Sequence, residues 1–288
     1  MLSLRREIKT QKGGPEMKAT RKFLILTAVV LGMLPGTLGV SSAITNGQPD
    51  GDTHPYVGLI VFDDENGPAW RCTGTLLSST VVLTAGHCTD GAVAARVWFD
   101  PQVIDPDYPN SGGTSVEAAG IHTHPDFCLG CGNGLLGLDT RDVGVIVLSE
   151  PVPLSEYGQL PDEGLVDTLR MKTDVTAVGY GVQSLTRGNP PHFWAGLLAR
   201  FFAPTKLIAS NQMNSDEFIK LTANPARGKG GTCFGDSGGP DLLTGTDTVL
   251  AVNSYVTNFN CTGVTYSNRI DIEDVLAFIK SYLPHGPR

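Results

Sequence analysis

GDSGGP, at residues 235–240, places one serine among three glycines. Glycine permits tight turns, and such a turn can direct the backbone amides of Gly235 and Ser237 into one hole that would stabilise an oxyanion. A serine hydroxyl is a poor nucleophile at neutral pH, so it needs an imidazole base and a carboxylate that orients this imidazole. The stretch therefore predicts a nucleophilic serine whose partners lie elsewhere in the chain.

One histidine and one aspartate are the candidates for those partners. TAGHC, at residues 84–88, follows an apolar run and sets His87 beside a cysteine. Asp142 directly precedes the apolar run 143–148, where a strand end can hold a carboxylate in a partly dry place. Asp139 is the alternative orienting residue. Neither a histidine nor an aspartate means much alone, but their order with Ser237 predicts a catalytic triad.

These motifs, together with DVGV at residues 142–145, resemble the chymotrypsin-like (trypsin-like) serine proteases, and the resemblance covers residues 44–288. It implies an all-β fold of two packed six-stranded antiparallel β-barrels with a C-terminal helix, and an active site between the barrels. It also implies that His87 is the general base, that Asp142 orients it, and that Ser237 attacks through an acyl-enzyme. Gly144 departs from the alanine that is more usual beside the aspartate.

The same resemblance implies a secreted serine endopeptidase that acts on protein or peptide substrates. It puts Gly231 at the base of the primary pocket, where trypsin-type enzymes carry an aspartate. It makes Ser254, Tyr255 and Val256 a wall strand in which Val256 replaces the usual glycine, and it puts Phe234 at the pocket mouth. These residues imply a preference for small or medium apolar side chains. Ser254 would also support Asp142.

ITNG, at residues 44–47, resembles the family's mature N-terminus, whose new ammonium group pairs with the carboxylate at Asp236. The bond between residues 43 and 44 is also the best signal-peptidase site, so export alone would release Ile44. Cleavage a few residues upstream, which leaves a short propeptide, is the alternative. No Lys or Arg lies between Lys22 and Arg71, which excludes activation by a trypsin-like enzyme.

Residues 1–43 have the pattern of a signal peptide. A basic segment with Lys18, Arg21 and Lys22 precedes the apolar run 23–34, and the small residues of 41–43 suit a signal peptidase. Met17 is an alternative true start. A membrane anchor is the other interpretation, but the run is shorter than the ~20 residues that span a bilayer. We therefore expect a secreted protein without membrane association after cleavage.

Composition favours a turn-rich β protein. The chain has 288 residues, 41% of them hydrophobic, with 35 Gly and 19 Pro. Apolar runs separated by turn residues predict strands, and apolar positions at helical spacing predict one helix at 271–283. We expect barrels at 44–155 and 156–288, with the boundary in the proline-rich stretch 151–161. The strands are expected at 56–62, 75–76, 81–84, 93–99, 143–148, 175–178, 249–256 and 263–266.

The net charge is −8, and residues 44–288 alone carry 14 basic and 27 acidic residues. This balance argues against a nucleic-acid partner. We expect a monomer with no cofactor. A non-catalytic secreted binding protein on the protease scaffold is the alternative function.

Six cysteines follow residue 43, which in an exported chain predicts up to three disulfides. Fifteen connectivities are possible, and spacing favours Cys72–Cys88, Cys128–Cys131 and Cys233–Cys261. The pattern of His122, His124, Cys128 and Cys131 also offers four zinc-type ligands, but a disulfide between the two cysteines is the better interpretation. A redox role for this Cys-x-x-Cys pair is disfavoured because no βαβ pattern surrounds it, and the acidic residues 63–65 suit a solvated turn better than a calcium site. We expect no metal.

Overall fold

The computed structural model describes residues 44, 47–131, 139–182, 198–209, 217–224, 230–258 and 261–284. The predicted signal peptide lies outside the described residues. Within the described part of the chain, no helix is long and apolar enough to cross a membrane.

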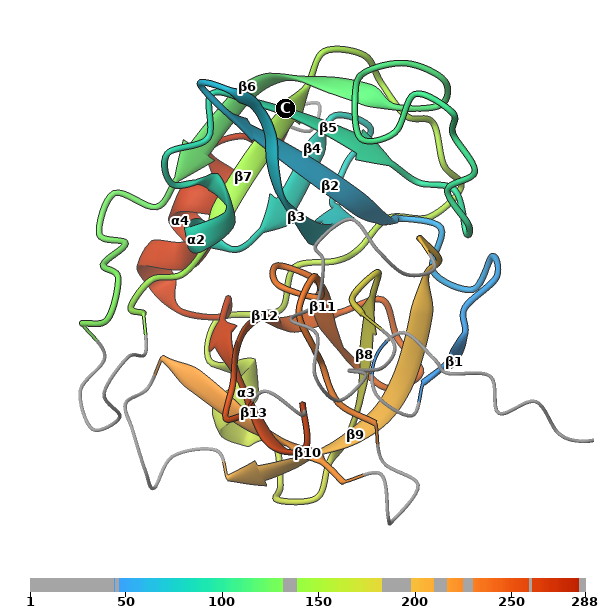
Figure 1. The fold of residues 1–288 in the computed structure, drawn as a ribbon. Coiled ribbons are helices and arrows are strands. Elements are labelled where there is room, and N and C mark those ends of the chain that lie inside the picture. The colour runs from blue at the N-terminus through green and yellow to red at the C-terminus, as the bar shows by residue number, and fades with distance from the viewer. Residues whose placement is uncertain are drawn as a thin grey trace, which may run out of the picture. The chain divides into compact units, whose positions relative to one another are not determined.

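Six antiparallel strands close the first barrel in the order β2-β3-β4-β7-β6-β5 (Figure 1). Its apolar core includes Leu59 on β2 and Ile146 on β7, both fully buried. The strand β3 carries glycine at residue 74 because a Cβ there would lie 2.6 Å from the Ile60 side chain. The strands are β2 (Val57–Asp64), β3 (Gly67–Leu76), β4 (Val81–Thr84), β5 (Ala94–Trp98), β6 (Val116–Thr123) and β7 (Gly144–Leu148).

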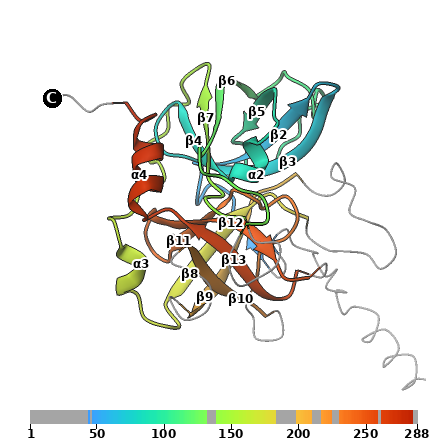
Figure 2. The same cartoon turned by 90° about the vertical axis from the view of Figure 1, so that its left-hand side faces the viewer.

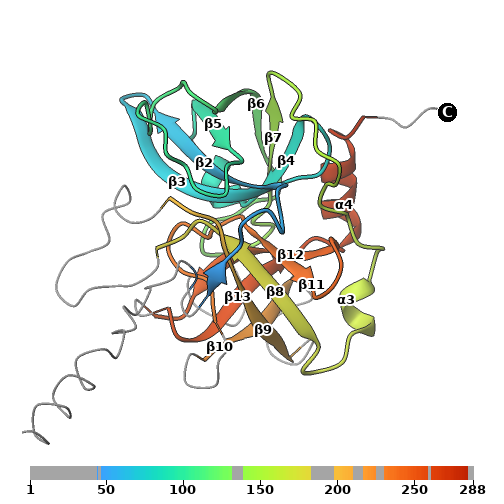
Figure 3. The ribbon, with the colours of Figure 1, turned by 90° about the vertical axis from the view of Figure 1, so that its right-hand side faces the viewer.

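The second barrel is a sheet in the order β9-β10-β13-β12-β11-β8, and pairing of β8 with β9 closes the ring. Figure 3 shows β8 and β9 side by side. The fold predicted from the resemblance, two six-stranded antiparallel barrels and a C-terminal helix, is confirmed. The strands are β8 (Asp174–Gly179), β9 (Phe201–Ala209), β10 (Phe218–Ala223), β11 (Pro240–Leu243), β12 (Val249–Val256) and β13 (Gly263–Arg269).

Both ends of the described chain cross to the other barrel. The short strand β1 (Gln48–Pro49) pairs with β9 of the second barrel. The C-terminal helix α4 (Glu273–Lys280) lies against the first barrel (Figure 2). There Tyr282, just after the helix, stacks on His122 at 4.4 Å between ring centroids, and Phe278 meets His124 at 4.9 Å.

A buried arginine joins the two barrels. Arg200, just before β9, donates from Nε to the Asp50 carboxylate at 2.8 Å. Its Nη1 group donates to the carbonyl oxygens of Val57 and Phe99 in the first barrel, at 2.9 and 3.0 Å. Both side chains of the ion pair are fully buried, so the charges depend on each other and on these carbonyls.

The structure adds elements that the sequence patterns did not predict. These are the strands β1, β6, β9, β10 and β11 and two single-turn helices, α2 (Gly86–Thr89) and α3 (Leu165–Thr168). The C-terminal helix is shorter than predicted and ends at Lys280. The boundary between the two halves, near residue 155, stays a prediction.

Candidate active site

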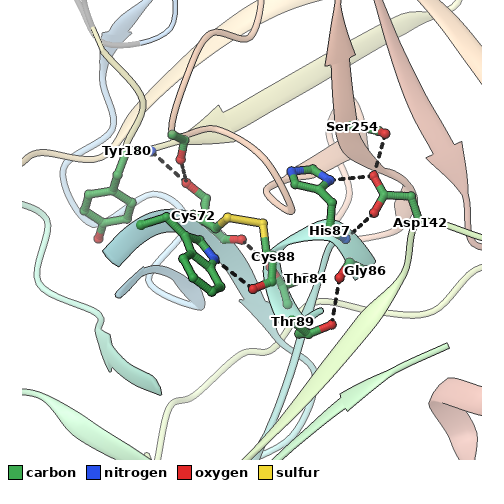
Figure 4. Close-up of a disulfide and its surroundings, with 12 residues drawn as sticks. Cys72, Thr84, Gly86, His87, Cys88, Thr89, Asp142, Tyr180 and Ser254 are labelled. Atoms are coloured by element: carbon green, nitrogen blue, oxygen red, sulfur yellow. Dashed lines mark hydrogen bonds and ion pairs between the residues drawn. A yellow bond between two sulfur atoms is a disulfide. The ribbon is translucent and has the colours of Figure 1, made fainter. Parts of the chain in front are cut away.

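The turn that follows β4 brings His87 to the edge of the first barrel. His87 lies in α2, and the neighbouring Cys88 is joined to Cys72 of β3 (Figure 4). Trp70 Nε1 donates to the Cys88 carbonyl at 2.9 Å and fixes the same turn. Gly86 is required, because a Cβ would lie 2.9 Å from the Phe127 ring and 3.0 Å from the Val143 nitrogen. The imidazole is thus held on a rigid single turn.

Asp142, which precedes β7, accepts three hydrogen bonds and is fully buried. Its Oδ1 accepts from the His87 amide at 2.6 Å, and its Oδ2 accepts from His87 Nδ1 at 2.8 Å and from Ser254 Oγ at 2.5 Å (Figure 4). A donating Nδ1 leaves His87 Nε2 as the acceptor nitrogen of the neutral ring. Asp139 accepts instead from the Gly130 amide, at 2.6 Å, so Asp142 is the carboxylate that orients the ring.

Gly144 has a packing reason for its departure from alanine. A Cβ at this position would lie 2.6 Å from the Thr89 side chain and 2.8 Å from the Ala85 carbonyl oxygen. Thr89 occupies that space because its hydroxyl donates to the Gly86 carbonyl and hydrogen-bonds Thr123. The glycine therefore compensates for a threonine under the histidine turn.

Burial and charge act in opposite directions on the pair His87 and Asp142. Burial alone would lower the pKa of His87, but the Asp142 carboxylate outweighs it and the pKa of His87 is raised above its ordinary value. Burial would likewise raise the pKa of Asp142, but His87 and the Ser254 hydroxyl hold the pKa of Asp142 below its usual range. At neutral pH, Asp142 is therefore a charged acceptor.

The serine turn is fastened to the first barrel through Thr73. The Thr73 amide donates to the Ser237 carbonyl at 2.8 Å, and the Thr73 hydroxyl donates to the Gly235 carbonyl at 2.8 Å. Gly235 and Gly238 have φ of 95° and 78°, which only glycine adopts readily. The hydrogen bonds of the described residues do not include one between the Ser237 hydroxyl and His87.

Asp236 is fully buried beneath this turn. Its carboxylate accepts from the Gly181 amide at 2.7 Å and from the Cys233 amide at 2.8 Å. Burial raises the pKa of Asp236 to about 7, against the lowering effect of these amides and of the nearby Arg71 charge. Ile44 is fully buried as well, and it packs against Ala177 and Ala203 of the second barrel.

The fold and this geometry agree with the sequence comparisons. A family model described as Trypsin matches residues 44–279. The chain belongs to the trypsin family. The resemblance on which the sequence analysis relied is confirmed.

Relatives of this trypsin-family chain include an elastase and a kallikrein. It is 28% identical over 210 residues to chymotrypsin-like elastase family member 1 of Canis lupus familiaris, covering 68% of this chain and 75% of the relative. It is 25% identical to kallikrein 1-related peptidase b22 of Mus musculus, covering 78% and 84%. Among solved structures, HL collagenase aligns with a TM-score of 0.64 and 18% identity over 83% of this chain and 97% of that one. Human heparin binding protein aligns with a TM-score of 0.60 and 16% identity, over 85% and 100%.

A cavity of about 540 Å³ lies beside Ser237 in this trypsin-family chain. Four of the five predicted substrate-binding residues line it, namely Phe234, Ser254, Tyr255 and Val256. Gly231 is buried and is not among the lining residues. The wall is completed by residues that were not predicted to line the pocket: Thr232, Cys233, Asn253, Thr257 and Asn258.

The structure contains three disulfides, Cys72–Cys88, Cys128–Cys131 and Cys233–Cys261, as the spacing favoured. The four residues weighed as zinc ligands are thus divided: two are bonded to each other, and both histidines pack on aromatic rings near α4. His124 Nδ1 also accepts from the Asp126 amide at 3.1 Å. Disulfides of this number are typical of proteins from oxidising compartments.

The residues that hold the serine turn could not be recognised from the sequence patterns. Thr73 and Thr84 lie on buried strands of the first barrel, and Thr84 donates to the Thr73 carbonyl at 2.9 Å. Arg71 approaches the same turn, since a Cβ built on Gly235 would lie 3.3 Å from Arg71 Nε. In the sequence these positions are only polar residues within short strands that are continuously buried, and that pattern does not reveal a function.

Proposed function

We propose that this chain is a secreted serine endopeptidase with the triad His87, Asp142 and Ser237. The observation that carries the proposal is the short contact of His87 Nδ1 with the buried Asp142, reinforced by Ser254, beside a serine turn with glycines at positive φ. That arrangement prepares an imidazole base next to backbone amides that can stabilise an oxyanion.

In the proposed reaction, His87 Nε2 accepts the Ser237 proton while Ser237 Oγ bonds to the scissile carbonyl carbon. The amides of Gly235 and Ser237 donate to the oxygen that becomes negative. The tetrahedral intermediate then expels the amine, which takes the proton from His87, and leaves an acyl-enzyme. Water, deprotonated by His87, releases the acid product. Asp142 stays ionised and stabilises the imidazolium throughout.

The cavity chemistry supports cleavage after small or medium apolar residues. Val256 and Phe234 supply apolar surface, and Thr232 supplies a hydroxyl. Among the described residues that line the cavity, none carries a carboxylate, so a basic substrate side chain would find no countercharge. A basic side chain buried without a partner is costly, which disfavours trypsin-like specificity.

Secretion and maturation form part of the same proposal. The disulfides suit an oxidising compartment, and cleavage after residue 43 would create an ammonium group at Ile44. This group would pair with the buried Asp236 and so order the serine turn. In the full-length chain the Ile44 nitrogen is part of a peptide bond.

A fluorophosphonate probe followed by intact-mass analysis tests the proposal. We expect one adduct on Ser237 in a chain that begins at Ile44, and none in Ser237→Ala, whose kcat should fall on the order of 10⁶ with folding intact. Ser149→Ala is the control variant, since Ser149 is an exposed serine directly after β7 of the first barrel. No adduct on a folded chain that begins at Ile44 would refute the proposed activity.

A non-catalytic binding protein is the second candidate. It is favoured by the similarity in fold to human heparin binding protein and by the lack of a hydrogen bond between Ser237 and His87 among the described residues. Heparin itself would be a poor ligand, because the net charge of this chain is −8. The same probe experiment distinguishes the two candidates.

A further inference from the structure

Besides Asp236, the second barrel buries another carboxylate, and the proposed catalysis does not use it. Asp241, on β11, is fully buried. Neither of its carboxylate oxygens accepts a hydrogen bond of ordinary length from the described residues. The Ser267 hydroxyl is the polar neighbour that lowers its pKa, and this hydroxyl donates to the Asn253 amide oxygen at 3.4 Å. Among the described residues, no cation is paired with Asp241.

The register of three strands brings Asp241 next to Ile44. Asp241 pairs directly with Ala177 of β8, and Ala177 pairs with Ala203 of β9. Side chains at directly opposite positions lie on one face of a sheet, ~5 Å apart. Ile44 packs against the same two alanines. Ile44 and Asp241 thus lie on one face of β8, with the small side chain of Ala177 at the shared position.

Asp236 reaches the same face of β8. Gly179 follows Ala177 by two residues, so both face the same side of the strand. A Cβ on Gly179 would lie 2.2 Å from Asp236 Oδ1, and one on Gly181 would lie 2.4 Å from Asp236 Oδ2. Burial, together with the charge of Asp236, raises the pKa of Asp241 to about 7. The two carboxyl groups therefore form one electrostatic unit.

The charges around this unit do not balance. Arg71, on β3, is the cation that acts on Asp236, and it is 3% exposed. Among the described residues, two buried carboxylates against one guanidinium leave one uncompensated negative charge, which a buried site does not tolerate. One bound proton or one additional cation would restore neutrality.

We propose that Asp241 is a second buried partner for the ammonium group of a chain that begins at Ile44, so that this ammonium neutralises Asp236 and Asp241 as a pair. The inference rests on the proposed maturation at Ile44 and adds a residue to it. While residue 43 remains attached, the two carboxyl groups share one proton. When the ammonium enters, that proton leaves to solvent, and both carboxylates are ionised.

The test compares the reactivity of the Ile44 α-amine in chains that begin at Ile44, with acetylation by acetic anhydride at pH 7 followed by mass spectrometry. A paired, buried ammonium reacts slowly. We expect Asp241→Asn to raise the acetylation rate at least about tenfold, a loss of roughly 1.4 kcal/mol of pairing, and Asp236→Asn to raise it as well. Asp271→Asn is the matched control, because Asp271 is equally buried in this barrel but pairs with Arg269. We expect no change in that control.

An α-amine that stays as protected in Asp241→Asn as in the unmodified sequence would overturn the proposal. Thermal unfolding identifies a variant that fails to fold, and Asp241→Ser then provides a smaller polar replacement. A further measurement needs no substitution: the stability lost as the pH rises from about 4 to about 7 should be greater with Ala43 retained than with Ile44 first, because the raised pKa of His87 contributes equally to both chains. Identical pH profiles of the two chains would also overturn the proposal. Phosphonate labelling of Ser237 is scored separately, so a failure of the proposed catalysis is distinguishable from a failure of this pairing.

Discussion

The Thr73 hydroxyl makes two buried hydrogen bonds beside the proposed oxyanion hole. It donates to the Gly235 carbonyl at 2.8 Å and accepts from the Tyr180 amide at 3.1 Å, and Thr73 is fully buried. Valine has nearly the shape of threonine, so Thr73→Val removes both bonds without opening a cavity. The backbone bond from Thr73 to the Ser237 carbonyl is unaffected.

The expected cost follows from the groups left behind. Each buried polar group without a partner costs about 1–3 kcal/mol, and the added methyl group returns up to about 1 kcal/mol. Thr73→Val leaves two such groups and should therefore lower the free energy of unfolding by about 1–6 kcal/mol, and the Tm by roughly 2–4 °C for each kcal/mol. The labelling rate of Ser237 should fall roughly tenfold, less than when an oxyanion donor is removed outright.

Thr75 provides the matched control, two residues further along β3 and on the same face of the strand. It is also fully buried, but its hydroxyl has no hydrogen-bond partner among the described residues. Thr75→Val should be neutral or stabilising by up to about 1 kcal/mol. Urea titrations of both variants measure the difference, and phosphonate labelling measures the site. Equal free energies of unfolding for the two variants would refute the reasoning.

Three further predictions concern the histidine turn and the barrel junction. The Asp142 carboxylate raises the pKa of His87 above the ordinary ~6.5, so the neutral imidazole is lost as the pH falls through a midpoint above that value. The pH profile of phosphonate labelling of Ser237 measures this midpoint. A midpoint below ~6.5 would contradict the prediction. Gly144→Ala should destabilise by about 1–3 kcal/mol through its clash with Thr89, and Thr89→Ala in the same chain should recover part of that loss in urea titrations. Arg200→Met removes the buried guanidinium and leaves the buried Asp50 carboxylate with His54 alone as its side-chain partner among the described residues. It should cost up to about 3–5 kcal/mol in thermal unfolding, with partial recovery when Asp50→Asn is added; full stability of the single variant would exclude this role.

The sequence predicted best what lies in contiguous motifs. The turns around His87 and Ser237 could be predicted because their glycine and cysteine neighbours form short, unusual motifs. The strands β2 and β12 could be predicted because each contains a continuous apolar run.

The missed strands lack that signal for physical reasons. The strand β9 contains Pro204, which normally argues against a strand, and β6 is only half-buried and has no regular apolar alternation. The strand β11 contains the charged Asp241, and charged residues are seldom buried. In each case the pairing partners, rather than local propensity, determine the strand.

The residues that support the site were beyond prediction from one sequence. Thr73 and Arg71 act across the interface between the barrels, on groups more than 150 residues away in the chain. Gly144 was visible as a departure from the family pattern, but its explanation needed the position of Thr89.

The first strand and the C-terminal helix each pack on the barrel formed by the other half of the chain, which limits how the protein can be cut into fragments. Because β1 pairs with the second barrel and α4 packs on the first, neither half of the sequence contains all the contacts of its own barrel. Cutting the chain near residue 155 should yield two pieces that do not fold separately and that regain structure only as a mixture. Fragment complementation is therefore the expected behaviour of this chain, and its thermal unfolding should occur in one cooperative step.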